Sequence, residues 1–315
     1  LFYLMIYLLN EFEMPSCKYN FKDNDLMKSF KEIWPVWREG IFQNIDLNQI
    51  TGADVIAIGD RLKEIFVLTS PDGRGQGTVA KAGYSWEAFV CWYLNLCTIG
   101  SNTVVIKSIK ANIPETIRDT ITVKYGSVSS NSESDILAVT FPEDDGRGFY
   151  KCDKAPSKDM LVRQLNDVIT ENLSKTSLTV IQCKTNWNDS SQIPFLYNLL
   201  YQLGGSTQNN VTIGKNSRNI NSLKRFSYGF ITVPSQSDDK IQKMKSGHIS
   251  VERVKNLTGG NYWGLDTKNG VASSIAECVN HNFSSGFEKN DIRQNIKNNI
   301  SLLNSDLNYF NLDLE

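Results

Sequence analysis

Apolar residues recur at helical spacing near the start of the chain and again near its end. The stretch 24–45 is predicted to form an amphipathic helix, which Pro35 is expected to kink or divide. Residues 53–69 are expected to form a second helix, with a strand at its end as an alternative. Residues 271–283 and 288–309 have the pattern of two further helices.

The middle of the chain alternates between helical and strand-like patterns. Residues 84–99 are apolar on nearly all sides, which predicts a helix buried in the centre of the protein. Strands are predicted at 103–109, 120–125, 135–141, 177–183 and 227–233. Helices are expected at 159–174 and 192–203, and loops at 70–83, 142–159 and 204–225. This order predicts an α/β fold with a mixed central β-sheet flanked by helices.

Composition adds little to this picture beyond the class of protein. Of the 315 residues, 40% are hydrophobic and 21% charged, as is ordinary for a globular protein with a sizeable core. The formal net charge of −1 does not indicate a nucleic-acid partner, although one basic face would suffice for one. The six cysteines include no CxxC pair, which favours reduced thiols in a cytoplasmic protein over a zinc site.

The chain begins with an apolar stretch, LFYLMIYLLNEFEM. This stretch is only about half as long as a transmembrane helix and lacks the positive residues that lead a signal peptide. We expect residues 1–13 to be a dispensable extension ahead of a natural start at Met14, although a short helix packed on the body is the alternative. Residues 14–315 are then expected to form a single domain, with no segment that spans a membrane.

Charged or polar side chains interrupt the apolar pattern at three places. Gln182 and Lys184 follow one another at the end of a buried strand, on the same face, because side chains alternate along a strand. Asp135 opens another strand, and Glu87 lies inside the buried helix. A buried charge is costly unless it has a partner, so these positions are candidates for chemistry.

One divalent cation would explain all of these costly residues together. Asp135, Gln182, Glu87 and the backbone carbonyl of Cys183 would supply the oxygen ligands that Mg²⁺ prefers. Lys184 would orient the attacking water or offset the negative charge that develops in the transition state. Taken singly, each residue has an ordinary explanation as a strand cap, a surface group or one half of a structural ion pair. Their joint order along the chain is less easily accidental.

That order resembles the core of the PD-(D/E)XK nucleases, which runs helix, three strands, helix, strand. Some lineages, including Mrr-like restriction enzymes, carry glutamine in place of the second acid, as IQCK does here. The phrases GRGQGTVAKAGYSWEAFVCWYLN and VIQCKTNWNDSSQIPFLYNLLY resemble bacterial type II restriction endonucleases, over residues of about 70–235. The resemblance implies a restriction-endonuclease-like fold and a Mg²⁺-dependent endonuclease acting on double-stranded DNA. The candidate catalytic residues would be Glu87, Asp135, Gln182 and Lys184.

Two features depart from the pattern of that family. The long gap between Asp135 and Gln182 requires an insertion at 142–176. Glu133 and the acidic run at 143–145 are alternative first acids. We prefer Asp135 because it opens an apolar strand, whereas the acidic run lies in a polar stretch.

Two segments are candidates for contact with DNA. Residues 185–192 follow the lysine of the motif, and their amides Asn186, Asn188 and Gln192 could read base edges. The polar stretch 204–225 carries basic residues suited to phosphate contacts, with an ordinary solvated loop as an equal alternative. These basic residues are Lys215, Arg218, Lys224 and Arg225.

The expected partners follow from the restriction-enzyme resemblance. Enzymes that cut palindromic sites are generally two-fold symmetric, so a homodimer is expected. A DNA methyltransferase would be a genetic rather than a physical partner. The alternatives are a repair or junction-cleaving nuclease of the same fold, and a catalytically inactive DNA-binding protein.

Overall fold

A computed structural model provides the fold of the chain. It describes residues 25–43, 45–46, 49–68, 76–98, 101–131, 133–142, 158–187, 193–204, 210–233, 247–264, 275–283 and 291–305. The predicted N-terminal extension, residues 1–13, and most of the predicted insertion loop at 142–159 lie outside these ranges.

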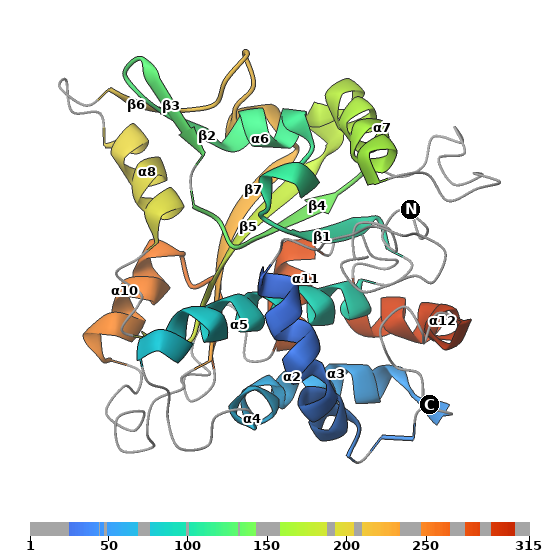
Figure 1. Cartoon of the computed structure of the whole chain (residues 1–315). Helices are drawn as coiled ribbons and strands as arrows, with labels where there is room; N and C mark the ends of the chain where they lie inside the picture. The colour runs from blue at the N-terminus through green and yellow to red at the C-terminus, as the bar shows by residue number, and fades with distance from the viewer. Residues whose placement is uncertain are drawn as a thin grey trace.

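A five-stranded mixed sheet forms the centre of the protein, in the order β1-β4-β5-β7-β8. Its strands are β1 (Thr103–Lys107), β4 (Ile136–Thr140), β5 (Ser177–Lys184), β7 (Arg225–Thr232) and β8 (Tyr262–Gly264). Strands β1, β4 and β5 pair in antiparallel fashion, whereas β5, β7 and β8 are parallel. The predicted mixed α/β architecture is therefore confirmed, with helices on either side of the sheet (Figure 1).

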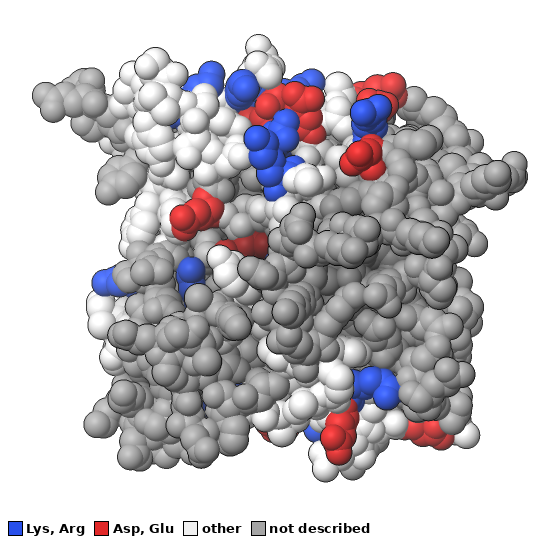
Figure 2. Space-filling view, in the orientation of Figure 1, with Lys and Arg blue, Asp and Glu red and all other residues white. Residues whose placement is uncertain are grey.

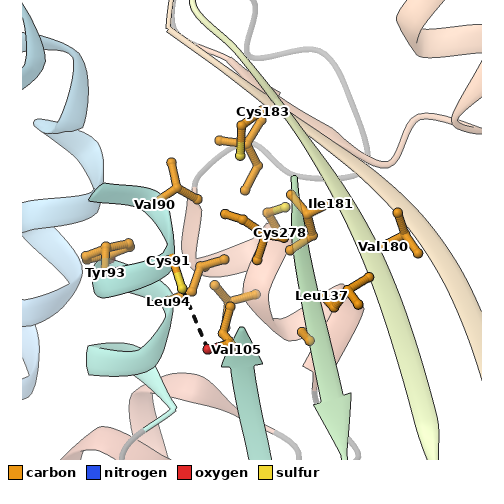
Figure 3. Close-up of a cluster of buried hydrophobic side chains, with 14 of the residues drawn as sticks. Val90, Cys91, Tyr93, Leu94, Val105, Leu137, Val180, Ile181, Cys183 and Cys278 are labelled. Carbon is orange, nitrogen blue, oxygen red and sulfur yellow. Dashed lines mark hydrogen bonds between the residues drawn. The ribbon is translucent and has the colours of Figure 1, made fainter. Parts of the chain in front are cut away.

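The long helix α5 (Gln76–Cys97) covers one face of the sheet, next to β1 and β5. Its side chains from Ser85 to Cys97 are buried, with Glu87 the partly exposed exception, as the all-round apolar pattern predicted. Figure 3 shows Val90 and Leu94 of this helix facing apolar side chains of the strands. Burial on both sides thus accounts for the lack of a polar face in this segment.

Further helices pack against the outer side of α5. These are α2 (Asp25–Phe42), α3 (Gly52–Asp60) and α4 (Leu62–Val67). Trp37 of α2 stacks on Phe89 of α5, and Phe66 of α4 meets Trp86 edge to face. Helices α11 (Ile275–Phe283) and α12 (Ile292–Ser305) also contact α3, and they lie below the sheet in Figure 1.

The opposite face of the sheet carries α6 (Glu115–Ile121) and α7 (Lys158–Glu171), above the sheet in Figure 1. A second, three-stranded sheet follows in the order β3-β2-β6. It consists of β2 (Thr122–Tyr125), β3 (Val128–Asn131) and β6 (Val211–Ile213), and α8 (Pro194–Leu203) packs against β6. The remaining elements are α10 (Ile249–Leu257) and the short 3-10 helices Lys110–Asn112, Leu173–Lys175 and Ile220–Ser222.

Several sequence predictions were wrong in detail. Helix α2 continues through Pro35, so the proline does not divide it. The stretch 53–69 forms two helices, α3 and α4, and no strand among its described residues. Helix α5 begins at Gln76, so the glycine-rich stretch expected to be a loop is largely helical. The polar stretch 204–225 contains β6 and a 3-10 helix, where only a loop was expected.

One hydrophobic cluster of buried residues extends from Trp34 to Ile296. Cysteines 91, 97, 183 and 278 are buried free thiols. None of the helices in the described ranges is long and apolar enough to cross a membrane.

Candidate active site

Asp135 lies directly before β4, at the point where β4 and β5 part. The pairing of Ile136 with Ile181 places Asp135 beside Gln182. On its other side, the backbone N–H of Ser108 donates to the Asp135 carbonyl oxygen at 3.0 Å. The main chain at Asp135 is therefore held by β1 and its side chain is directed toward β5.

The carboxylate of Asp135 is anchored through one of its two oxygens. Its Oδ2 accepts hydrogen bonds from Gln182 Nε2 at 2.5 Å and from the backbone N–H of Cys183 at 2.7 Å. Hydrogen bonds to a charged acceptor are stronger than neutral ones, so this carboxylate is firmly oriented. Its Oδ1 accepts no hydrogen bond from the described residues, which leaves that oxygen available to a ligand.

Gln182 is only 1% exposed and takes part in a chain of polar contacts. Its Nε2 faces Asp135, while its Oε1 accepts a long hydrogen bond of 3.4 Å from the hydroxyl of Tyr228. The expected cation ligand, the amide oxygen, therefore points away from Asp135. A half-turn of the amide would reverse the two ends, and the Tyr228 hydroxyl would then accept from Nε2 instead of donating to Oε1.

Cys183 contributes its backbone to the site and its side chain to the core. In an extended strand the N–H and C=O of one residue point the same way, so its carbonyl oxygen also faces the Asp135 side. Its thiol lies on the other face of the sheet, toward α5 (Figure 3). Burial raises the pKa of this thiol well above its usual value, and the nearby carboxylates raise it further.

Lys184 is the last residue of β5 and shares a face with Gln182 and Asp135. Its backbone carbonyl accepts from Val233 at 3.1 Å, and its side chain is partly exposed. Burial raises the pKa of Asp135, and the positive charge of Lys184 is the strongest influence that lowers it. The lysine and the aspartate of the predicted motif therefore interact electrostatically on one side of the sheet.

Glu87 approaches the same strand ends from α5. Burial raises the pKa of Glu87 to about 7, and the negative charge of Asp135 contributes to that rise. The positive charges of Lys107 and Lys184 act in the opposite direction. All four predicted residues, Glu87, Asp135, Gln182 and Lys184, are thus linked by hydrogen bonds or by their charges.

Two further residues of this cluster were not predicted from the sequence. Lys107 ends β1, and its Nζ lies 3.4 Å from Glu87 Oε2, with the side chain 5% exposed. Tyr228 contacts Gln182 from β7. A lysine inside the apolar run TVVIKSI was a visible signal for Lys107, but Tyr228 resembles any core aromatic residue.

The chemistry of the donor atoms fits a hard cation. Among the described residues, no group of three or more His, Cys, Asp and Glu side chains is arranged to hold a metal ion. A cation here would instead rest on Asp135 and Glu87, the carbonyl oxygen of Cys183, and the Gln182 oxygen after rotation of its amide. Magnesium is commonly held by one or two carboxylates and several waters, so this oxygen-only set suits it.

The predicted DNA contacts within 215–225 do not gather around this site. Strands β5 and β7 are parallel, with Ser177 opposite Arg225 and Lys184 opposite Thr232. Arg225 therefore lies seven residues away along the strands, roughly 23 Å at about 3.3 Å per residue. The adjacent Lys224 bonds through its N–H to Thr176, so it shares this far end. The main chain of both residues is therefore distant from Lys184, and their contact with DNA stays a prediction.

Arg218 has a structural partner that the sequence did not reveal. Its Nη1 lies 3.2 Å from Oδ2 of Asp119, a residue of α6 whose side chain is 5% exposed. Asn216 donates to the same oxygen at 2.8 Å. Asn216 and Ser217 both have positive φ, and Lys215 pairs with Arg218 across them, which forms a tight hairpin turn. Arg218 therefore holds this turn against α6.

The other predicted DNA contacts lie beyond the end of β5. Asn186 is half-buried two residues after Lys184, whereas Asn188 and Gln192 fall outside the described residues. On the face seen in Figure 2, the Lys and Arg side chains along the upper edge are mixed with Asp and Glu. The described surface on this face therefore does not form one continuous basic area.

Comparison with known proteins adds no relative. No protein-family model matches the chain, and no curated protein sequence matches it. The arrangement of Glu87, Asp135, Gln182 and Lys184 at the ends of β4 and β5 is therefore the basis on which a function is proposed.

Proposed function

We propose that this protein is a Mg²⁺-dependent endonuclease that hydrolyses phosphodiester bonds in double-stranded DNA. The observation that carries the proposal is the position of Asp135. Its carboxylate is fixed to the backbone and side chain of β5, its Oδ1 is available, and Lys184 acts on it from the same face of the sheet. A fixed carboxylate beside a partly exposed ammonium at the end of a strand suits phosphate chemistry.

The order of elements supports the proposal. Helix α5 is followed by the antiparallel strands β1, β4 and β5, then by α8, and then by β7 parallel to β5. This is the helix, three strands, helix, strand order that the resemblance to PD-(D/E)XK nucleases implies. The second sheet and helices α6 and α7 are additions between the elements of this core.

Each residue then has a distinct task. When bound, Mg²⁺ would lower the pKa of a water molecule and stabilise negative charge on the reacting phosphate. Asp135 and Glu87 would hold the cation, with the Cys183 carbonyl as a neutral ligand. The Cys183 N–H fixes the orientation of Asp135, and Tyr228 does the same for Gln182. Lys184 would orient the attacking water or offset charge on the phosphate oxygens.

The finer proposal is a sequence-specific type II restriction enzyme that acts as a homodimer. Its support is the resemblance of the segments around Glu87 and Lys184 to bacterial restriction enzymes, together with the extensive structure outside the core. Discrete fragments from a plasmid of known sequence would support this specificity. A smear, or cleavage confined to branched DNA, would favour a non-specific or junction-cleaving nuclease instead.

Plasmid cleavage in Mg²⁺ tests the proposed activity. The Asp135→Asn and Lys184→Ala variants should lose at least about a hundredfold in cleavage rate, because each loses a group needed in the transition state. Both should still shift a DNA duplex in a gel containing Ca²⁺. Glu133→Gln and Lys175→Ala, at exposed positions of the same charge types, serve as matched controls and should cleave normally. Unchanged cleavage by either site variant would contradict the assignment.

A further inference from the structure

Lys107 is a buried ammonium in an unusual environment. Its Nζ lies 3.4 Å from Glu87 Oε2, and no other hydrogen-bond partner for this atom exists among the described residues. Strand pairing places Lys107 opposite Ile136, the residue after Asp135. The ammonium is therefore held between β1 and α5, and its positive charge acts on both carboxylates of the proposed cation site.

This environment is costly, and it limits what Lys107 can do. A buried ion pair with unsatisfied donors is often less stable than a well-packed apolar side chain of similar volume. With its side chain 5% exposed, Lys107 cannot reach a DNA phosphate directly. Any effect on function must act through Glu87, which makes Lys107 a positioning residue.

The charges of the cluster balance when both of its carboxyl groups are ionised. Glu87 and Asp135 then supply two negative charges, and Lys107 and Lys184 supply two positive charges. A divalent cation added to this neutral group would leave it with two excess positive charges. Charges repel more strongly away from bulk water, so the cluster disfavours the cation until further negative charge arrives. A DNA phosphate at Lys184 would supply such charge.

We propose that Lys107 is a resident counter-ion of Glu87 that weakens binding of a divalent cation until the DNA phosphate is in place. The inference rests on the proposed function and assigns a role to a residue outside the predicted motif. Lys107 holds one oxygen of Glu87 in the free protein, and its charge opposes the incoming cation. Cation affinity and DNA affinity are then coupled, and each ligand strengthens binding of the other to the same extent.

Calcium titration of the full-length protein by calorimetry tests this inference without any cleavage step. Wild type should bind Ca²⁺ weakly alone and at least tenfold more tightly with a saturating duplex, after correction for Ca²⁺ bound by the duplex itself. Lys107→Met should bind Ca²⁺ at least tenfold more tightly than wild type in the absence of DNA. Lys107→Arg keeps the charge and should behave as wild type. Lys110→Met, an exposed lysine three residues away, is the matched control.

The outcomes separate this inference from the proposed function. If Lys107→Met fails to fold, as judged by circular dichroism, Lys107→Gln provides the same loss of charge with a polar side chain. Wild-type Ca²⁺ affinity in the folded charge-free variant would overturn the role of Lys107 and leave the cation site intact. Absence of Ca²⁺ binding by wild type both with and without DNA would overturn the cation site itself, and this inference with it.

Discussion

Gln182 holds Asp135 with its nitrogen, at the position that an acid would occupy in the PD-(D/E)XK pattern that the sequence resembles. The amide therefore stabilises the carboxylate in the absence of a cation, through the short hydrogen bond between Nε2 and Oδ2. An acid at this position would face Asp135 as a second negative charge. We therefore expect the choice of amide or acid to decide whether the stability of the fold depends on the proposed cation.

Gln182→Glu should make stability depend on Mg²⁺. Without the cation we expect a loss of about 2–3 kcal/mol, because a hydrogen bond to a charged group is replaced by repulsion. Addition of Mg²⁺ should recover much of this loss. Thermal unfolding with and without Mg²⁺ measures both effects. Gln182→Met removes the hydrogen bond without adding charge, so it should be destabilised but insensitive to Mg²⁺; equal sensitivity in the two variants would contradict this account.

The pKa of Glu87 predicts how cation binding depends on pH. Burial and Asp135 raise this pKa from 4.5 to about 7, so the folded protein favours the protonated form. The associated stability is fully present below pH 4.5 and is lost as the pH rises through about 7. A cation binds the ionised form, so its affinity should rise in the same range.

Calcium titrations at pH 6, 7 and 8 check this dependence. Affinity should rise by up to about tenfold per unit below pH 7 and then level off, because one proton competes with the cation. Glu87→Gln should bind more weakly and with a flatter pH profile. A wild-type affinity that is constant over this range would show that Glu87 does not take part in cation binding.

At the level of single residues, the sequence predicts only part of the site. Asp135, Gln182 and Lys184 could be found because they interrupt apolar runs at strand ends. Tyr228 could not, since its contact with Gln182 depends on the pairing of β5 with β7. Lys107 was visible as a charge inside an apolar run, but its contact with Glu87 depends on the packing of α5 against β1, which the local pattern does not contain.

At the level of helices, strands and turns, the hairpin turn that follows β6 has a structural role that its amino-acid composition does not indicate. Its basic and amide residues suggested contact with DNA, yet Asn216 and Arg218 both bind Asp119 of α6. A sequence of Lys, Asn, Ser and Arg has the same composition whether it meets a phosphate or a buried carboxylate. Only the position of α6, which was not predicted, distinguishes the two.

Asp119→Ala should therefore destabilise the protein by about 2–4 kcal/mol, because the buried partner of Arg218 is lost. Arg218→Ala should cost less, since its side chain is 28% exposed and more readily solvated. Lys215→Ala, at an exposed position in the same turn, should stay within about 0.5 kcal/mol of wild type. Urea unfolding measures the free energy of unfolding of the three variants. A stable Asp119→Ala protein would mean that the turn is held by other contacts.

Replacement by alanine should lower the stability of the protein at one glycine and raise it at another. At Gly264 of β8, an added Cβ would lie 2.5 Å from Trp187 and 2.7 Å from Thr232, so the change should cost about 1–3 kcal/mol. At Gly83 of α5 the added Cβ would meet no atom within 4 Å apart from the adjacent backbone of its own helix, so the higher helix propensity of alanine should stabilise the protein by about 0.5–1 kcal/mol. Urea unfolding of both variants provides the test. If both variants changed the free energy of unfolding in the same direction, the close packing around Gly264 in β8 would be contradicted.

For the whole molecule, the sequence predicts the main sheet better than the second one. The core strands are continuous apolar runs, because both faces of the sheet are covered. Strand β3, in contrast, is exposed along its whole length, and β6 has only three residues, of which one is buried. Such strands depend on pairing with β2 and carry little pattern of their own.

Strand β5 has a further consequence for the protein as a whole. Its neighbours are β4 and β7, and seven of its eight residues are buried. Its amide hydrogens should exchange with solvent only upon global unfolding, whereas those of the exposed β3 should exchange through local opening. Hydrogen–deuterium exchange followed by mass spectrometry would rank the strands by the exchange rate of their amide hydrogens. Rapid exchange in β5 would contradict the expected order. The proposed cation site would then be built on the last part of the protein to open, already formed before any ligand arrives.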